Sequence, residues 1–247
     1  MTCADLPDWY LRRRIPVVDL RSETWRRAQA EVVPAGYAPN DCMRRLVGAR
    51  RLRRVGRGLF VVVDLVRETP ALAIACGLFA RLPHYVTTDA ALGFHGLIDQ
   101  PHARITVVLP RPRRPIEIGP VVVRPVTQSP DRIAGADAFD TTTDGFKVRL
   151  ATREQAVVDA LAEPTWMEYG DLLGEVLAAF TADELDRTAA AALARSTASA
   201  QRLGYLLEGA GRETPTALAK LVPVRAVKLR PGPRTKGPYS TRWRVYG

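Results

Sequence analysis

The sequence predicts an α+β protein with a small N-terminal domain and a larger mixed second domain. Helical and strand-like stretches alternate over residues 1–66 and end in a glycine-rich hairpin. Beyond residue 66 the composition shifts, and apolar helices and short strands follow each other. The chain has 247 residues, 47% of them hydrophobic, which is enough for one or two cores. We therefore expect domains over residues 1–66 and 67–247.

The N-terminal residues have the pattern of three short helices, with a strand between the first two. Residues 5–14 place apolar side chains at helical spacing, and residues 15–18 are strand-like. Ser22 is a suitable N-cap for a second helix over residues 22–33. A turn rich in Pro and Gly then leads to a third helix at residues 40–48.

A hairpin follows the third helix. Residues 52–55 and 59–63 are its two strands, and Gly56-Arg57-Gly58 supplies glycines where the backbone reverses. The order of helix, strand, helix, turn, helix and two-stranded hairpin is that of a winged helix-turn-helix. The second helix of its motif enters the major groove of DNA.

Residues 67–247 mix helices and strands. Thr88, Thr152 and Thr181 are predicted N-caps, the last two in capping boxes with Gln155 and Glu184. A loop rich in Pro and Arg, residues 110–115, separates two of the strands. Helices are expected at residues 68–82, 89–96, 153–161, 168–180, 182–194 and 198–209, and strands at residues 85–86, 104–109, 121–124, 146–150, 224–229 and 241–246.

Positive charge is concentrated at the two ends of the chain. Residues 1–62 hold 13 Arg and six acidic residues, residues 63–219 hold 15 basic and 20 acidic residues, and residues 220–247 hold eight basic residues and no acid. The net charge of +10 is therefore divided into a basic head, an acidic middle and a basic tail. Codon usage in a GC-rich genome accounts for Arg in place of Lys, but not for the missing acids. Such concentration is typical of surfaces that bind a polyanion.

The third helix and the hairpin carry the candidate DNA-binding residues. With Met43, Leu46 and Val47 toward the core, the opposite side presents Asn and Arg, which suit adenine and guanine edges. Seven Arg occur within 14 residues without an acid, which costs self-repulsion unless a polyanion relieves it. The alternative is a solvated polar face and an Arg-rich hairpin. The candidate residues are Asn40, Arg44, Arg45, Arg50, Arg51, Arg53, Arg54 and Arg57.

The C-terminal tail is a candidate second basic surface. Trp243 and Val245 alternate with Arg242 and Arg244, so a strand here has one apolar and one basic face. It is either an edge strand kept soluble by charge or a surface for nucleic acid or an acidic partner. The residues of this candidate surface are Arg234, Lys236, Arg242 and Arg244.

Motifs for catalysis and metal binding are sparse. The three histidines share no metal-ligand spacing with one another or with the cysteines, and no Gly-x-Ser-x-Gly elbow or Walker loop occurs. None of the four lysines follows an acid by two positions, as in many metal-dependent nucleases. The acids of residues 136–145 fit turns better. We expect no enzyme activity, no catalytic residue, no metal and no cofactor.

The cysteines and the N-terminus indicate a cytoplasmic protein. Cys3, Cys42 and Cys76 are odd in number and widely spaced, so no disulfide framework is expected. The N-terminus lacks the apolar region of a secretory signal, and no apolar run approaches the ~20 residues that span a bilayer. We expect no membrane association.

Several segments of the chain resemble the AbiEi family, the antitoxin and transcriptional-repressor half of AbiE-type (type IV) toxin–antitoxin systems. The more specific features are Ala-Leu-x-x-His-Gly-Leu at residues 91–97 and Glu-x-x-x-x-Asp-Ala-Leu at residues 154–161. The resembling segments are residues 44–48 with 52–60, 85–97, 150–161 and 202–207, and the pair Arg242-Trp243. They occur in the family's order, although residues 1–20 are longer than the start of some members.

The resemblance implies a repressor and antitoxin. Its N-terminal winged helix would bind inverted repeats of double-stranded DNA in its own promoter, and its second domain would oppose a nucleotidyltransferase-like toxin. We expect Leu92, His95, Glu154 and Asp159 to be structural. Two alternatives remain: a stand-alone winged-helix transcription factor with a ligand-sensing second domain, and a DNA-acting nuclease.

Overall fold

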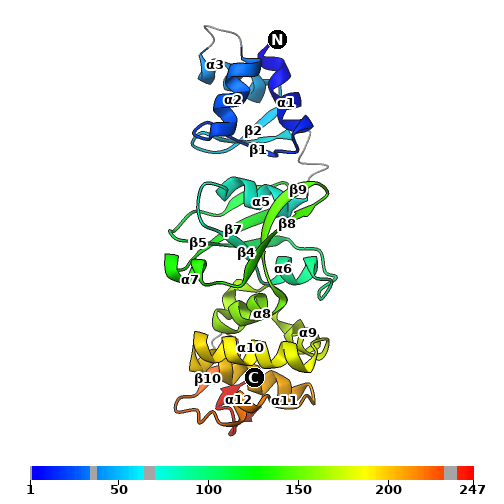
Figure 1. The fold of residues 1–247 in the computed structure, drawn as a ribbon, viewed down its shortest axis with the longest axis vertical. Helices are drawn as coiled ribbons and strands as arrows, with labels where there is room; N and C mark the ends of the chain where they lie inside the picture. Colours follow the sequence, from blue (N-terminus) through cyan, green and yellow to red (C-terminus); the bar gives the residue numbers. More distant parts are fainter. Residues whose placement is uncertain (1, 34–37, 64–69, 231–237) are drawn as a thin grey trace. The chain divides into compact units, whose positions relative to one another are not determined.

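The computed structural model describes residues 2–33, 38–63, 70–230 and 238–247, which form a mixed α+β structure as predicted (Figure 1). The predicted domain boundary between residues 66 and 67 lies outside the described residues and stays a prediction. The chain divides into two compact units, the first made of Met1–Val86, Val107–Ala134 and Asp140–Arg149, the second of Thr87–Thr106, Gly135–Phe139 and Leu150–Gly247.

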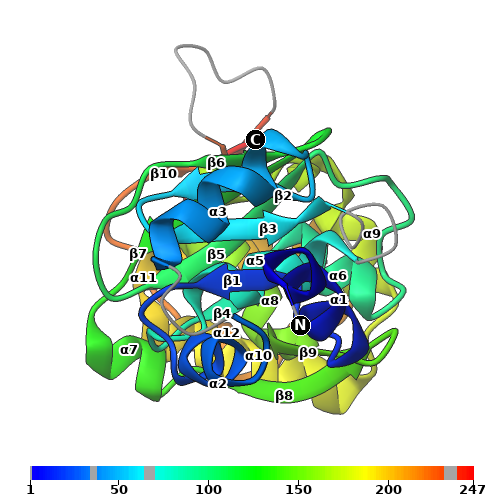
Figure 2. The ribbon, with the colours of Figure 1, turned by 90° about the horizontal axis from the view of Figure 1, so that it is seen from above.

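The helices and strands of the N-terminal residues follow each other in the order that the sequence predicts. Their strands form one antiparallel sheet in the order β1-β3-β2, and Figure 2 shows these strands with α1, α2 and α3 grouped about them. A shift of register between Arg54 and Gly56 marks a bulge in the hairpin. The elements are η1 (Cys3–Asp5), α1 (Leu6–Arg12), β1 (Val17–Asp19), α2 (Glu23–Val32), α3 (Pro39–Gly48), β2 (Leu52–Gly56) and β3 (Leu59–Val62).

Large apolar side chains hold these N-terminal elements together. Tyr10 and Val18 are fully buried, and Trp25 of α2 is nearly so. Trp9 Nε1 donates a hydrogen bond of 2.6 Å to Glu31, which joins α1 to α2. Such aromatic groups remove much apolar area from water, and their burial stabilises the packing of these elements.

A six-stranded sheet follows, in the order β6-β7-β5-β4-β9-β8. Strand β5, one of its two central strands, is almost wholly buried, with Val107, Val108 and Leu109 at 0% exposure. The helices near it in sequence are α5 (Ala71–Phe79), α6 (Asp89–Phe94) and α7 (Pro130–Ala134). The strands are β4 (Tyr85–Thr87), β5 (Arg104–Leu109), β6 (Ile116–Ile118), β7 (Val121–Thr127), β8 (Ala138–Thr143) and β9 (Phe146–Ala151).

Strand β8 corrects the prediction of turns for the acids of residues 136–145 at Asp140, whereas Asp144 lies in a turn as predicted. Only Asp144 and Gly145 form the reversal, with positive φ angles of 49° and 80°. Asp140 lies within β8, and its carboxylate pairs with Arg149 of β9 at 3.1 Å. The three threonines that follow Asp140 favour extended backbone, and the cross-strand ion pair accommodates the acid.

Helices dominate the remainder of the chain. Thr152 and Thr181 are the N-caps of α8 and α10 as predicted, but the reciprocal capping box is present only at Thr181 with Glu184. The side chain of Gln155 instead donates to Asp159 and accepts from the backbone N–H of Asp137. The elements are α8 (Arg153–Ala162), η2 (Pro164–Trp166), η3 (Gly170–Leu172), α9 (Leu173–Ala178), α10 (Ala182–Arg195), α11 (Thr197–Gly209) and α12 (Thr216–Ala219).

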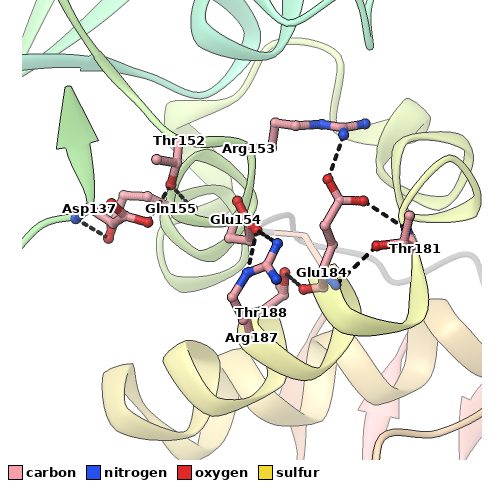
Figure 3. A network of polar contacts seen from close by, with 9 residues as sticks. All are labelled: Asp137, Thr152, Arg153, Glu154, Gln155, Thr181, Glu184, Arg187 and Thr188. Atoms are coloured by element: carbon pink, nitrogen blue, oxygen red, sulfur yellow. Dashed lines mark hydrogen bonds and ion pairs between the residues drawn. The ribbon is translucent and has the colours of Figure 1, made fainter. Parts of the chain in front are cut away.

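A network of polar contacts joins α8 to α10 (Figure 3). Arg153 of α8 pairs with Glu184 of α10 at 2.5 Å, and Arg187 of α10 pairs with Glu154 of α8 at 2.6 Å. Backbone and side-chain hydrogen bonds from Thr181 lower the pKa of Glu184, with further help from the two arginines. The pairs run in opposite directions between the helices, and they fix the register of one helix on the other.

The tail corrects a second prediction, a strand over residues 241–246. Residues 241–244 are a turn between the two-residue strands β11 (Tyr239–Ser240) and β12 (Val245–Tyr246), and β10 (Val227–Lys228) pairs in parallel with β12. Trp243 is buried against Gly204 of α11, where a side chain larger than hydrogen would overlap the indole ring. The packing of Trp243 on Gly204 therefore outweighs the preference for a strand that the alternation of apolar and basic residues suggests.

Thr88 also differs from its prediction. It occupies the N-cap position of α6 with a φ of 54°, but its side chain forms no capping hydrogen bond. Its Oγ1 donates instead to the carbonyl oxygen of Trp166 at 3.4 Å. Helix α6 ends at Phe94, two residues earlier than expected. In the described ranges, no helix is long and apolar enough to cross a membrane.

Candidate nucleic-acid interface

Helix α2 supports the candidate recognition helix. Ser22 Oγ accepts a hydrogen bond from the backbone N–H of Trp25 at 3.0 Å, the predicted N-cap, and donates to the carbonyl of Asp19 at 2.7 Å. Trp25, Ala28 and Val32 are buried on one face of α2. The cap and this apolar face fix the start and the orientation of α2.

Helix α3 has a buried face and a polar face, but its buried face differs from the prediction by one residue. Cys42, Met43 and Leu46 are buried, whereas Val47 is 37% exposed. Cys42 takes the core position expected for Val47, since residues 42, 43 and 46 lie on one side of a helix with 3.6 residues per turn. Burial is the main cause that raises the pKa of the Cys42 thiol to about 12.

The polar face of α3 presents Asn40, Arg44 and Arg45, all of them outside the core as predicted. Arg44 forms an ion pair with Asp41 one turn earlier, and its side chain is 80% exposed. Exposed pairs of this kind contribute about 0–1 kcal/mol, so a base edge or a phosphate can replace Asp41 at little cost. Val47 lies beside Asn40 and Arg44 on the same exposed surface.

Arg50 ends α3 in a strained backbone conformation. Its φ is 56°, and the backbone N–H groups of Arg50 and Arg51 donate to the carbonyls of Val47 and Leu46. This pair of hydrogen bonds is the Schellman motif, in which the left-handed position is usually glycine. A side chain there costs roughly 1–2 kcal/mol, yet the chain places an Arg at the end of the candidate recognition helix.

The hairpin carries the remaining candidates. Arg53 and Arg54 of β2 and Arg57 of the turn are exposed. Arg54 Nε donates to the carbonyl of Gly56 at 3.3 Å, which holds its side chain along the turn. Arg51 is less exposed than predicted, because its guanidinium pairs with Asp8 of α1 at 2.9 Å. Apart from Arg51, the candidates therefore form one exposed basic surface over α3 and the hairpin.

The candidate second basic surface is tied into the second unit. Arg242 pairs with Glu208 at 3.5 Å, and Arg244 Nη1 donates to the carbonyl of Val224 at 2.6 Å. Arg234 and Lys236 lie outside the described residues. The guanidinium groups of Arg242 and Arg244 thus have structural partners, and a role of this surface in binding stays a prediction.

The residues that carry the sequence resemblance hold the second unit together. Thr87 Oγ1 donates to Asp159 at 2.8 Å, and His95 Nε2 donates to the carbonyl of Ala151 at 3.0 Å. Asp159 is 1% exposed and Leu92 is fully buried. These contacts agree with the structural roles that we expect for Leu92, His95, Glu154 and Asp159.

Other titratable groups are half-buried, as are His84 and His102, or buried, as is Cys76. Burial lowers the pKa of His84 and His102, and burial raises the pKa of Cys76 to about 11. Among the residues that the structure describes, no three His, Cys, Asp or Glu side chains are placed to hold a metal ion.

The second unit also contains a groove of about 820 Å³ beside α9, α11 and the tail. Tyr205 and Tyr239 line it together with three acidic residues, Asp171, Glu175 and Glu208, and with one basic residue, Arg242. Its acidic lining is opposite in charge to the surface over α3, so the groove does not suit a polyanion.

Comparison with known proteins finds a family match and a similar fold. Residues 84–209 match a family model described as the AbiEi antitoxin C-terminal domain. The crystal structure of the RV2827C protein from Mycobacterium tuberculosis is similar to the chain, with a TM-score of 0.66 and 18% sequence identity, over 98% of this chain and 90% of that chain. This likeness concerns the fold alone.

Two structures of ANT(2")-Ia match more weakly. The complex with adenylyl-2"-tobramycin has 15% identity and a TM-score of 0.29 over 60% of this chain and 97% of its own. The solution structure has 16% identity and a TM-score of 0.30 over 59% of this chain and 92% of its own. These scores are too low to indicate a common fold. No curated protein sequence matches the chain.

Proposed function

This chain belongs to the AbiEi antitoxin family, and from that premise we propose that it is a DNA-binding repressor as well as the antitoxin of its operon. An antitoxin implies a cognate toxin, and we take this toxin to be nucleotidyltransferase-like. We assign DNA binding to residues 1–66, acting as a winged helix-turn-helix, and antitoxin activity to residues 67–247. Both functions are exercised in the cytoplasm.

The observation that carries the DNA-binding proposal is the exposed face of α3. Asn40, Arg44 and Arg45 project from a short helix whose other side is buried, as a helix that enters the major groove requires. Arg binds guanine O6 and N7 with two hydrogen bonds, and Asn binds adenine in the same way. Asn40 and Arg44 are one turn apart, so they can reach neighbouring base pairs.

The hairpin and the end of α3 supply phosphate contacts. Arg50, Arg53, Arg54 and Arg57 are exposed and follow α3 directly. Phosphate contacts fix the register of a protein on DNA, while base contacts select the sequence. The proposed operator is an inverted repeat in the chain's own promoter.

A titration of promoter DNA at several salt concentrations tests this proposal. With about 6–10 phosphate contacts, affinity should fall ~10³–10⁵-fold between about 50 and 200 mM salt. Lys220→Gln is a control that removes one positive charge. Because Lys220 is exposed on the second unit, this substitution should leave the affinity for promoter DNA unchanged. A flat salt response in the wild type contradicts the assignment of the arginines to phosphate.

Co-expression tests the antitoxin half of the proposal. The chain should restore growth to cells that express the neighbouring toxin gene, and a variant that cannot bind DNA should still do so if toxin expression is driven by a foreign promoter. Loss of rescue in a folded, non-binding variant contradicts two separate modules.

The groove of the second unit supports a second candidate, a transcription factor that senses a small ligand. Its lining has two tyrosines and three carboxylates against one guanidinium, Arg242, so its excess of acid suits a cationic aromatic compound. If no nucleotidyltransferase gene lies next to the gene of this protein, the ligand-sensing transcription factor is favoured over the antitoxin. A nuclease is the third candidate, and magnesium-dependent cleavage of plasmid DNA would support it.

A further inference from the structure

We propose that the loop between β5 and β6, residues 110–115, is a second DNA contact that binds the phosphate backbone. The inference rests on the proposed DNA-binding function and extends it beyond residues 1–66. The loop reads Pro110-Arg111-Pro112-Arg113-Arg114-Pro115, so half of its residues are Arg and half are Pro. All three arginines are exposed.

The loop stands on a rigid base. Val107, Val108 and Leu109 at the end of β5 are fully buried, and the carbonyl of Leu109 accepts a hydrogen bond of 3.0 Å from the backbone N–H of Gln128. Three prolines restrict the backbone further, because each ring fixes φ near −65°. Arginines held in this way lose less conformational entropy when they bind a ligand.

The charges of the loop are left unbalanced within the chain. Arg111, Arg113 and Arg114 form no ion pair in the described part of the protein, although elsewhere in it many arginines are paired with acids. Three like charges within four residues repel each other, and a polyanion relieves this repulsion. Proline lacks an N–H group, so the guanidinium groups are the loop's main hydrogen-bond donors.

A hydrogen bond connects the loop's strand to the hairpin. The guanidinium of Arg53 donates to the carbonyl oxygen of Glu117 in β6, two residues beyond the loop, and both residues belong to the first compact unit. An Arg side chain has five N–H donors, so this bond leaves others for phosphate. The loop therefore continues the basic surface of the hairpin, which favours DNA over an unrelated acidic partner.

The test compares two triple variants of the full chain in the same promoter titration. In the first, Arg111, Arg113 and Arg114 are replaced by Gln. In the second, a matched control, the same three charges are removed elsewhere at the exposed positions Arg132, Lys147 and Lys220. Thermal unfolding followed by circular dichroism confirms that both variants are folded.

The loop variant should bind promoter and scrambled DNA about 10–100-fold more weakly, and the slope of log affinity against log salt should fall by up to ~0.9 for each phosphate that the loop no longer neutralises. The ratio between the two DNAs should stay unchanged, because phosphate contacts carry no sequence information. Replacing the same three residues by Lys keeps the charge and should restore most of the slope.

Each contrary result overturns the inference. If the wild type and the control variant bind DNA and the loop variant equals them in affinity and slope, the loop does not contact DNA, while the proposed function stands. If the loop variant loses only the preference for the promoter, the loop reads bases and is not a phosphate contact. If it keeps DNA binding but loses RNA or toxin binding, another partner occupies the loop. If the wild type binds no DNA at all, the proposed function fails first.

Discussion

Four helices in the described part of the protein end in the same hydrogen-bond motif, but the residue in the left-handed position differs between residues 2–63 and the second unit. Helices α1 and α3 end on Arg14 and Arg50, with φ angles of 53° and 56°, whereas α6 and α11 end on Gly96 and Gly211, at 71° and 66°. Glycine adopts this conformation without a steric penalty, and Arg does not. The N-terminal domain thus keeps a charged side chain where the backbone favours glycine.

Arginine is also used differently in the two regions. In the second unit Arg202 of α11 donates to the carbonyls of Leu161 in α8 and Lys228 in β10, and Arg212 donates to the carbonyl of Phe180. These guanidinium groups therefore join separate elements of the unit. On α3 and the hairpin most arginines remain exposed. In the second unit these arginines therefore contribute to stability, whereas the exposed arginines of α3 and the hairpin remain available for the DNA contacts that we propose.

Among the substitutions that test this comparison, we expect the largest loss of stability at Trp243, which lies in the second unit. Trp243→Ala removes a ring that is 1% exposed and packs on Gly204, and it should lower the free energy of unfolding by about 3–5 kcal/mol. The indole also donates to Glu208 at 2.7 Å, and the substitution leaves that carboxylate without this donor. Urea denaturation measures the change, and Val224→Ala, at a side chain 77% exposed, is the control. If the free energy of unfolding falls by less than about 1 kcal/mol, the packing of the C-terminal tail on α11 does not stabilise the second unit as we expect.

Arg44 should show the opposite behaviour, with weaker binding and little change in stability. Arg44→Ala should weaken promoter binding by about 1–3 kcal/mol and scrambled DNA much less, because it removes a base contact. Arg57→Ala should weaken both DNAs similarly and reduce the salt slope by about one. If Arg44→Ala weakens both DNAs equally and the hairpin variant abolishes discrimination, the reading element is the hairpin.

Exchanging the residues at the helix ends tests the comparison directly. Arg50→Gly should leave the protein as stable or more stable, because it relieves about 1–2 kcal/mol of strain against the added chain entropy of glycine, yet it should weaken DNA binding. Gly96→Ala should lower stability by about 1 kcal/mol through conformation alone, since a Cβ there meets no atom within 4 Å. Unfolding midpoints and the promoter titration give both readouts. If Arg50→Gly instead lowers the stability, the positive φ of Arg50 is not a strained conformation that the protein tolerates for binding.

The smallest effect is a pH dependence of the second unit. Burial lowers the pKa of His102, so below the ordinary His pKa of about 6.5 the unfolded chain binds more protons than the folded one. The stabilisation is therefore complete above about pH 6.5 and is lost as the pH falls through the folded-state pKa. Urea midpoints at about pH 7.5 and 5.5 should differ, and less so in His102→Gln. Equal shifts in both proteins assign the pH dependence to other groups.

The sequence by itself determined the features that depend on near neighbours. The order of elements from α1 to β3, the N-caps Ser22, Thr152 and Thr181, and the polar face of α3 all follow from local spacing and capping, and the structure has them. An N-cap side chain and the backbone N–H three residues later can form a hydrogen bond independently of the rest of the chain. Exposure of the arginines was predictable for the same reason, because α3 has one strongly apolar side.

Where the sequence allowed more than one local conformation or more than one buried residue, only the tertiary structure decided between them. The choice of Cys42 over Val47 for the core of α3 depends on the elements packed against it, and the turn at Trp243 depends on Gly204 of a distant helix. Strand β8 depends on its neighbour β9, whose Arg149 pairs with Asp140. The strain at Arg50 is likewise invisible in the sequence, because a positive φ is tolerated only where the surrounding contacts impose it. Packing between distant residues outweighs local preferences of about 1 kcal/mol, and for this reason such details lie beyond the reach of pattern alone.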